Sequence, residues 1–269
     1  MRNKNALQNA QNGKRGTGAY MKKVWCLFEQ SGTFKNEFKK FGFEAYDVDI
    51  LNDFKQTDFE IDLFANIAAA AKGEKSLFDK IHADDLVFAF FPCTKFTEKH
   101  YMNARGDSFF LKHFDDLRKL EYSRKAIDDT HHNYTLICQL FEIALKKGFK
   151  MVVENPDAQP HFLKDFFPFK PTITIKNRAV YGDYYKKPTN FWFVNFKPSY
   201  NFIFENCEQE AKPVMSKKKI GFSGLDSKRA KEAQVHRSLI SPMFANRFIR
   251  EYILTEKELE DYTKGNYGD

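Results

Sequence analysis

Four short segments place polar or reactive residues at or shortly after the end of an apolar run, where a buried strand would end. These segments are Ser31-Gly32, Asp47-Val48-Asp49, Pro92-Cys93 and Glu154-Asn155-Pro156. Small residues before a helix let backbone amides approach a ligand, and an acid after the next strand is typical of a side chain that binds ribose hydroxyls. A thiol and a carboxyl group are typical of a nucleophile and a proton donor.

Each segment also has an ordinary structural explanation. A glycine turn needs no ligand, an acid at a strand end is often merely solvated, and most isolated cysteines are small buried side chains. The carboxyl ends of parallel strands meet at one edge of a sheet, however, and ligands bind there. The four segments together therefore predict one site with a ligand loop, a ribose acid, a nucleophile and a carboxyl acid.

The apolar pattern around these segments predicts an α/β fold with a mixed sheet. Apolar runs predict strands over residues 24–28, 43–49, 86–91, 149–153, 172–175 and 190–196, and helical spacing predicts helices over 34–41, 124–147 and 242–254. The last two strands suit an antiparallel edge of an otherwise parallel sheet.

The composition is that of an ordinary globular chain. Its 269 residues are 42% hydrophobic, and the net charge of +7 is compatible with a polyanionic partner without demonstrating one. The 30 Phe supply area for a core and rings that can stack on bases. The four cysteines lack zinc-site spacing, so we expect no metal. Since no stretch is apolar enough to cross a bilayer, we expect a cytoplasmic protein that binds no membrane.

Taken in order, the motifs resemble the cytosine-5 DNA methyltransferases. The matching segments are Leu27-Phe28-Glu29-Gln30-Ser31-Gly32-Thr33-Phe34, Gly42-Phe43, Asp47-Val48-Asp49, Ile61-Asp62-Leu63, Asp85 to Thr94 with its Pro92-Cys93, Val153-Glu154-Asn155-Pro156, Asn177 to Lys187 with its Tyr181-Gly182, and Pro242 to Tyr252. The resemblance implies a Rossmann-like class I methyltransferase fold, with a mixed sheet, helices on both faces and a small basic insert.

The resemblance also implies a cofactor and roles for particular residues. The cofactor is S-adenosylmethionine, and the residues implied to bind it are Phe28, Ser31, Gly32, Thr33, Asp47, Asp49, Asp62 and Pro92. Cys93 adds to carbon 6 of cytosine, Glu154 protonates ring nitrogen 3, and Asn155 orients the loop. Residues implied to contact DNA are Lys95, Arg105, Tyr185, Lys217, Lys218 and Lys219. The DNA is either a duplex with a flipped base or a single strand, and we expect a monomer. The resemblance further implies that residues 94–123 form a mobile loop over the DNA.

These expectations divide the chain into five parts. They are a disordered tail (1–20), a catalytic domain that binds S-adenosylmethionine (21–196), a reduced target-recognition insert (197–235), a C-terminal helix that completes the catalytic domain (236–256) and a charged tail (257–269).

Three features depart from the family pattern. Gln30 stands at the first glycine of the family's Phe-x-Gly-x-Gly, Lys187 and Thr189 replace a pair of arginines after Tyr181-Gly182, and the insert is short. Lys is no equivalent of a bidentate Arg, so Lys187 is assigned to the catalytic group by position alone. Two other functions therefore stay open: a catalytically silent relative that binds nucleic acid, and a pyrimidine-modifying enzyme that acts on single strands or free nucleotides.

Overall fold

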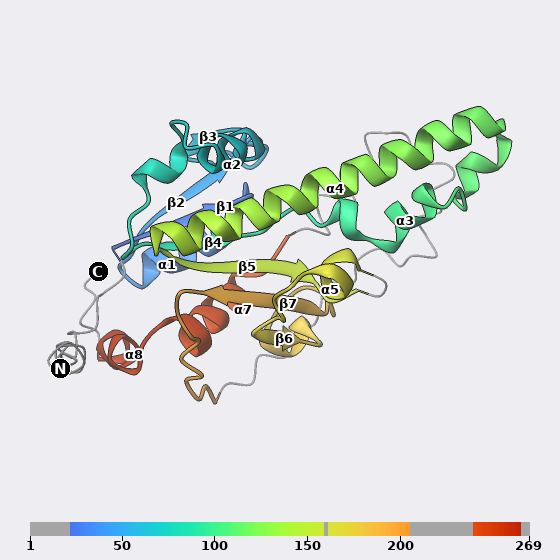
Figure 1. The fold of residues 1–269 in the computed structure, drawn as a ribbon. Helices are drawn as coiled ribbons and strands as arrows, with labels where there is room; N and C mark the ends of the chain where they lie inside the picture. The colour runs from blue at the N-terminus through green and yellow to red at the C-terminus, as the bar shows by residue number, and fades with distance from the viewer. Residues whose placement is uncertain (1–21, 159–160, 205–238, 265–269) are drawn as a thin grey trace, which may run out of the picture.

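The computed structural model describes residues 22–158, 161–204 and 239–264 (Figure 1). The predicted N-terminal tail and most of the predicted insert, with Lys217, Lys218 and Lys219, lie outside the described residues. Among the described residues, no helix combines the length and the apolar character that crossing a membrane requires.

A seven-stranded mixed sheet forms the centre of the molecule. Its strands are β1 (Lys23–Leu27), β2 (Glu44–Asp49), β3 (Phe59–Glu60), β4 (Leu86–Ala89), β5 (Lys150–Pro156), β6 (Ile173–Ile175) and β7 (Thr189–Val194). The order in the sheet is β3-β2-β1-β4-β5-β7-β6, with β7 antiparallel to β5 and to β6 and all other pairs parallel. The strand order reverses between β1 and β4, and ligands bind at such a switch point in open α/β sheets. The predicted α/β fold with an antiparallel edge is confirmed.

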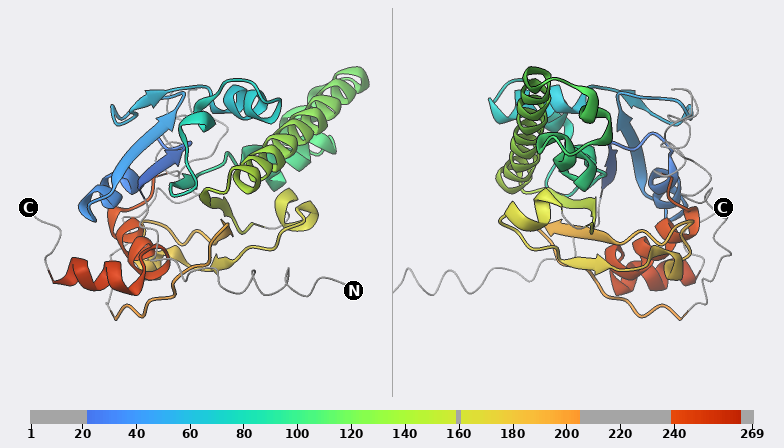
Figure 2. Two further views of the ribbon diagram at one scale, coloured as in Figure 1. Left: turned by 60° about the vertical axis from the view of Figure 1, so that its left-hand side comes forward. Right: turned by 90° about the vertical axis from the view of Figure 1, so that its right-hand side faces the viewer.

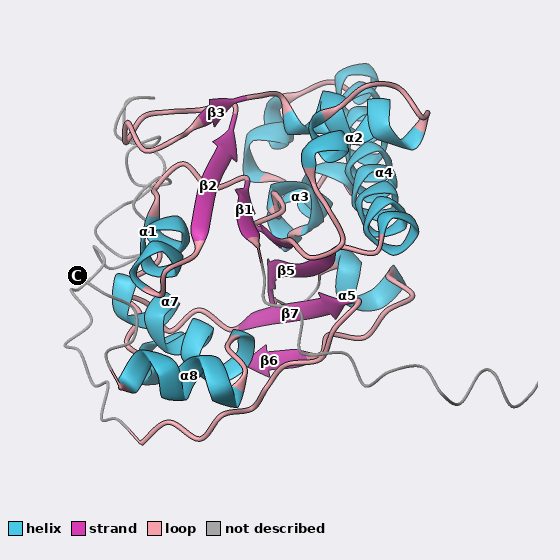
Figure 3. Ribbon diagram, turned by 90° about the vertical axis from the view of Figure 1, so that its left-hand side faces the viewer, coloured by secondary structure: helices cyan, strands magenta, loops and turns pink. Residues whose placement is uncertain are grey.

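Helices cover both faces of the sheet (Figure 3). They are α1 (Thr33–Lys40), α2 (Leu63–Ala71), η2 (Leu77–Lys80), η3 (Thr94–Phe96), α3 (Glu98–Ala104), η4 (Phe109–His113), α4 (Asp116–Lys147), α5 (Phe162–Phe166), η5 (Arg178–Tyr181), α7 (Pro242–Phe248), η6 (Ile249–Ile253) and α8 (Glu256–Thr263). Alternate residues of β1 show the two layers. Trp25 and Leu27 belong to the core that includes α2 and α4, whereas Val24 and Cys26 belong to the core that includes α1 and α7. Burial on both faces explains why the central strands are continuous apolar runs.

The segment after Cys93 differs from its prediction. Instead of a mobile loop, residues 94–123 form η3, α3, η4 and the first turns of α4, which begins where Asp115 accepts a hydrogen bond from the backbone N–H of Arg118. The N-terminal half of α4 projects beyond the sheet with α3 beside it (Figures 1 and 2). We call residues 98–127 the helical arm. Its pattern escaped detection because Leu117 and Leu120 are exposed among charged residues rather than forming a buried stripe.

The C-terminal region also corrects two expectations. The helix predicted over 242–254 is α-helical only to Phe248 and continues as the π-helical turn η6. The predicted charged tail (257–269) contains all of α8 except its first residue, Glu256, and the helix begins with a capping box of Thr255 and Glu258. The ring of Tyr262 lies 4.6 Å from that of Phe41, which holds α8 against the core. The charged composition of this segment gave no indication of the contact between Tyr262 and Phe41, so the helix was not predicted.

Candidate active site

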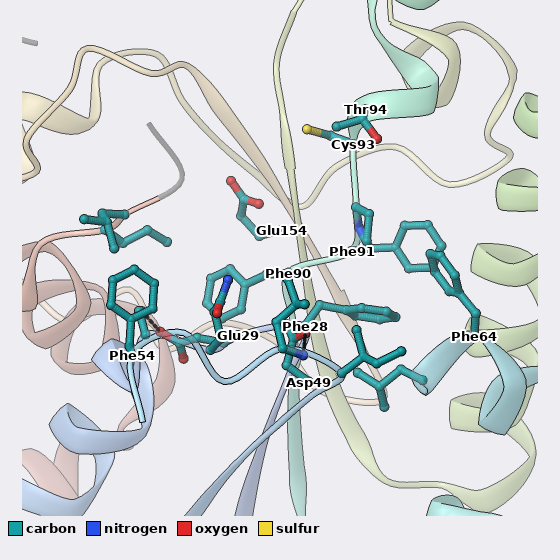
Figure 4. Close-up of a pocket in the computed structure, with 18 of the residues that line it drawn as sticks. Phe28, Glu29, Asp49, Phe54, Phe64, Phe90, Phe91, Cys93, Thr94 and Glu154 are labelled. Carbon is teal, nitrogen blue, oxygen red and sulfur yellow. Dashed lines mark hydrogen bonds between the residues drawn. The ribbon is translucent and has the colours of Figure 1, made fainter. Parts of the chain in front are cut away.

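A cavity of about 540 Å³ lies at the carboxyl ends of β1, β2, β4 and β5 (Figure 4). This volume is in the range of small-molecule sites. The predicted site residues that line it are Phe28, Ser31, Asp49, Asp62, Pro92, Cys93, Glu154 and Lys187. The structure therefore brings side chains from all four predicted strand ends into one site.

Cys93 and Glu154 form what we call the nucleophile end of the cavity, together with Lys187. Cys93 is the fourth residue after the end of β4, is half-buried, and points its thiol into the same part of the cavity as the carboxyl group of Glu154 (Figure 4). Burial raises the pKa of the Cys93 thiol, and the positive charge of Lys187 opposes this rise. The thiol thus has a cationic neighbour that favours its nucleophilic, ionised form.

Glu154 is buried in β5, and two cations of the described residues lie near it. Its Oε1 lies 3.8 Å from Nζ of Lys187 and 3.5 Å from Nη1 of Arg178. Arg178 is 1% exposed, and our sequence analysis missed it because most lone arginines are exposed. Its place in the segment before Tyr181-Gly182 was the one available signal.

Asn155 lies behind the cavity, where it is fully buried. Its Nδ2 donates to the backbone carbonyl of Phe91 at 2.8 Å and to that of Glu154 at 3.1 Å. The Asn155 amide therefore ties the end of β5 to the chain just before Pro92 and Cys93. The orienting role of Asn155 stays a prediction, and this contact is the geometry on which it would depend.

The opposite part of the cavity, which we call the acidic end, is lined by aromatic rings and carboxylates. The ring of Phe28 packs 5.4 Å from those of Phe64 and Phe91. Asp49 accepts a hydrogen bond from the backbone N–H of Leu51 at 2.9 Å, and burial raises its pKa. Asp62 caps α2 by accepting from the backbone N–H of Ala65.

Glu29 occupies the N-terminus of α1, a place where a helix can bind an anion. Its Oε1 accepts from the backbone N–H of Phe34 at 3.1 Å and from Oγ of Ser31 at 2.9 Å, and burial raises its pKa. Its Oε2 is buried and has no hydrogen-bond partner among the residues that the structure describes. Gly32 has φ 72°, and a Cβ there would come within 2.8 Å of Gln56 Oε1, so the turn requires glycine. Glu29 lies within the first segment that matches the family, but the sequence assigned it no role, because its burial and its hydrogen bonds depend on the folded turn.

Two predicted cofactor residues of the same turn do not line the cavity. Gly32 is the left-handed residue before α1, and Thr33 turns its hydroxyl toward Ser31 and the backbone carbonyl of Ile240. Gln30, the departure from the family's glycine, does line the cavity. Its side chain accepts a hydrogen bond from the backbone N–H of Asp53 at 3.0 Å, and this contact ties the turn after β1 to the segment after β2.

Asp47 also lies off the cavity, contrary to its assignment as a cofactor residue. It is fully buried and 3.8 Å from Nζ of Lys35, and burial raises its pKa to about 9. Ligand-type atoms of Cys26, Glu29 and Asp47 lie within 4.8 Å of one another, a separation that a metal ion could bridge. The ammonium of Lys35 supplies positive charge there instead.

The residues assigned to DNA contact are only partly placed near the site. Lys95 pairs with Asp129 at 2.5 Å, and Arg105, on the helical arm, pairs with Glu98 and Asp107. Tyr185 does not line the cavity and packs near Tyr184. The structure thus gives these side chains partners within the protein.

Scans against protein-family models and against curated proteins find no match for this chain. The resemblance to cytosine-5 DNA methyltransferases therefore stays a prediction that rests on the residues and their geometry.

Proposed function

We propose that this protein transfers a methyl group from S-adenosylmethionine to carbon 5 of cytosine in DNA. The observation that carries the proposal is that Cys93 and Glu154 share one cavity with Asp49 and Asp62. A nucleophile with a neighbouring proton donor is what activation of the cytosine ring requires. Acids and apolar side chains beside them suit the adenosine part of a cofactor.

The acidic end fits S-adenosylmethionine better than a dinucleotide. Dinucleotides place their pyrophosphate at a helix N-terminus, but Glu29 already fills that place at α1. Oε2 of Glu29, which has no hydrogen-bond partner in the described part of the chain, suits a ligand that brings positive charge or hydrogen-bond donors. Asp49 would hold the ribose, and Asp62 with Leu63 would contact the adenine. When bound, the cofactor supplies an electrophilic methyl group.

The nucleophile end then activates the base. The Cys93 thiolate forms a bond from Sγ to carbon 6, and Glu154 gives its proton to ring nitrogen 3. The electron pair of the 5,6 double bond becomes available at carbon 5, which would take the methyl group as its bond to sulfur breaks; the electron pair of that bond would stay on sulfur, so that S-adenosylhomocysteine leaves. A base then removes the carbon 5 proton, the double bond re-forms as the Cys93 thiolate leaves, and the proton on nitrogen 3 returns to Glu154. Because carbon 6 is covered in a stacked duplex, a double-stranded substrate must flip its base.

Methyl transfer from labelled S-adenosylmethionine tests the proposal. We expect label in mixed-sequence DNA that elutes as 5-methylcytosine after digestion to nucleosides. Label in single strands or free nucleotides but not in duplex DNA would favour the pyrimidine-modifying alternative. DNA binding without transfer to any of these substrates would favour the silent relative and overturn the proposal.

A further inference from the structure

Arg178 is the most deeply buried cation next to the cavity, and it bridges two acids. Its Nη1 lies 3.5 Å from Oε1 of Glu154, and its Nη2 lies 2.5 Å from Oδ2 of Asp183. The guanidinium also lies over the ring of Phe244, with its Cζ 4.6 Å from the ring centroid. A buried charge is kept only where partners compensate it, so this arrangement has a specific geometry.

The second acid anchors Arg178 to the closing helix. Asp183 is fully buried, and its Oδ1 accepts from the backbone N–H of Ser241 at 2.9 Å. Ser241 caps α7 and donates its hydroxyl to the backbone carbonyl of Gly182. Gly182 has φ 87°, and a Cβ there would come within 2.5 Å of Met243 Sδ, so turn and helix meet closely. These contacts hold Asp183 in place, and Asp183 in turn holds the guanidinium of Arg178 beside Glu154.

Both cationic contacts of Glu154 are to the same oxygen. Arg178 and Lys187 approach Oε1, which leaves Oε2 as the oxygen that can carry a proton toward a substrate. Lysine is a flexible point charge, whereas the planar guanidinium fixes direction. Thr189 stands at the second position of the family's arginine pair. It is fully buried in β7, and its hydroxyl donates a hydrogen bond to the backbone carbonyl of Lys187. The chain thus has no arginine at the two positions after Tyr181-Gly182, but Arg178, which precedes Tyr181-Gly182, brings a guanidinium to Glu154.

We infer that Arg178 is a positioning residue that holds Oε1 of Glu154, so that Oε2 presents the proton to the cytosine ring. This inference rests on the proposed function. If Arg178 has this role, the protein can be active without the arginine pair, because the positive charge beside Glu154 comes from residue 178 instead of from residues 187 and 189. Arg178 acts through Glu154 and does not line the cavity itself.

The test compares Asp183→Asn with the double variant Asp183→Asn/Arg178→Met. The double variant removes Arg178 without leaving the buried charge of Asp183 unpaired, which protects folding. We expect the single-turnover rate of methyl transfer to fall about 10- to 100-fold in the double variant relative to Asp183→Asn. The dissociation constant for S-adenosylmethionine and the KM for DNA should stay within about twofold, as expected for a loss confined to the chemical step.

Two further variants separate positioning from packing. Arg247→Met is a matched control, because Arg247 also lies 4.6 Å over a ring, that of Tyr181, and pairs with an acid, Glu251. It should keep the wild-type rate. Adding Lys187→Arg to the double variant should recover part of the lost rate, because a guanidinium then reaches Glu154 again.

Three outcomes would overturn the inference. Equal rates in the double variant and Asp183→Asn would remove the role of Arg178 and leave the proposed function intact. A loss of cofactor affinity as large as the loss of rate would show a merely structural role. If the wild-type protein transfers no methyl group to any substrate, the proposed function fails, and this role fails with it.

Discussion

The two ends of the cavity differ in charge and in how their side chains are held. The acidic end is lined by Glu29, Asp49 and Asp62, whereas the nucleophile end has the cavity's lysine, Lys187, beside Cys93. Backbone N–H groups hold the three acids, and an ion-pair network holds Glu154. The difference matches the chemistry: one end suits a positively charged cofactor, and the other suits a base that gains negative charge as the thiolate adds. Variants at the nucleophile end should change rate, and variants at the acidic end should change cofactor affinity.

Cys93→Ser should have the largest effect. A serine hydroxyl ionises far less readily than a thiol, so covalent addition stops and methyl transfer falls below detection. Cofactor affinity should stay at the wild-type value in isothermal titration calorimetry. Cys138→Ser is the control, because Cys138 is a half-buried thiol that does not line the cavity. Full activity of Cys93→Ser would show that Cys93 is not the nucleophile and would contradict the assignment of the nucleophile end.

Glu154→Gln should reduce single-turnover transfer about 100- to 10,000-fold, the usual contribution of a general acid. The glutamine keeps the shape of the side chain but cannot release a proton in the same way. The dissociation constant for S-adenosylmethionine should not change. If Glu154→Gln weakens cofactor binding but leaves the single-turnover rate unchanged, Glu154 acts in cofactor binding and not in the chemical step.

Asp49→Ala should act in the opposite way. It should weaken cofactor binding about 10- to 100-fold, the free energy of hydrogen bonds to a charged group. The single-turnover rate at saturating cofactor should be nearly unchanged. Glu74→Gln, at an exposed acid that does not line the cavity, should have no effect on either quantity. A lower rate with normal affinity would contradict the division into two ends.

Lys187→Met should have the smallest effect, a shift in the pH dependence. Burial raises the pKa of Cys93, so the wild-type rate should increase with pH through a range above that of an ordinary thiol. Loss of the positive charge of Lys187 raises that pKa further and moves the profile to still higher pH, with a few-fold lower rate at neutral pH. The exposed Lys186→Met should leave the profile unchanged. An unmoved profile in Lys187→Met would remove Lys187 from the nucleophile end.

The strand ends were readable from the sequence because buried parallel strands are apolar until they reach the edge of the sheet. That rule found Cys93, Glu154 and Asp49, but it also selected Asp47. The register explains the error: Asp47 pairs with Cys26 inside β1, whereas Asp49 lies beyond the last residue of β1. Strand pairing is a long-range property, so the local pattern of one strand does not contain it.

Two other features depended on contacts that no local pattern records. Arg178 is buried because Glu154 and Asp183, which come from separate elements, compensate its charge. The helical arm is held partly by His100, whose ring lies 2.7 Å from the backbone carbonyl of Ala126. The burial of Arg178 and the fold of the helical arm therefore depend on tertiary contacts, and the usual preferences of these residue types do not predict them.

Covalent trapping tests the central claim most directly. DNA that contains 5-fluorocytosine should be mixed with the protein and S-adenosylmethionine, because fluorine at carbon 5 cannot leave as a proton and the bond to sulfur then persists. The account predicts a protein–DNA adduct in intact-mass spectra, which peptide mapping assigns to Cys93 and which requires the cofactor for the added methyl group. No adduct with the wild-type protein, or an adduct on another residue, would contradict the account.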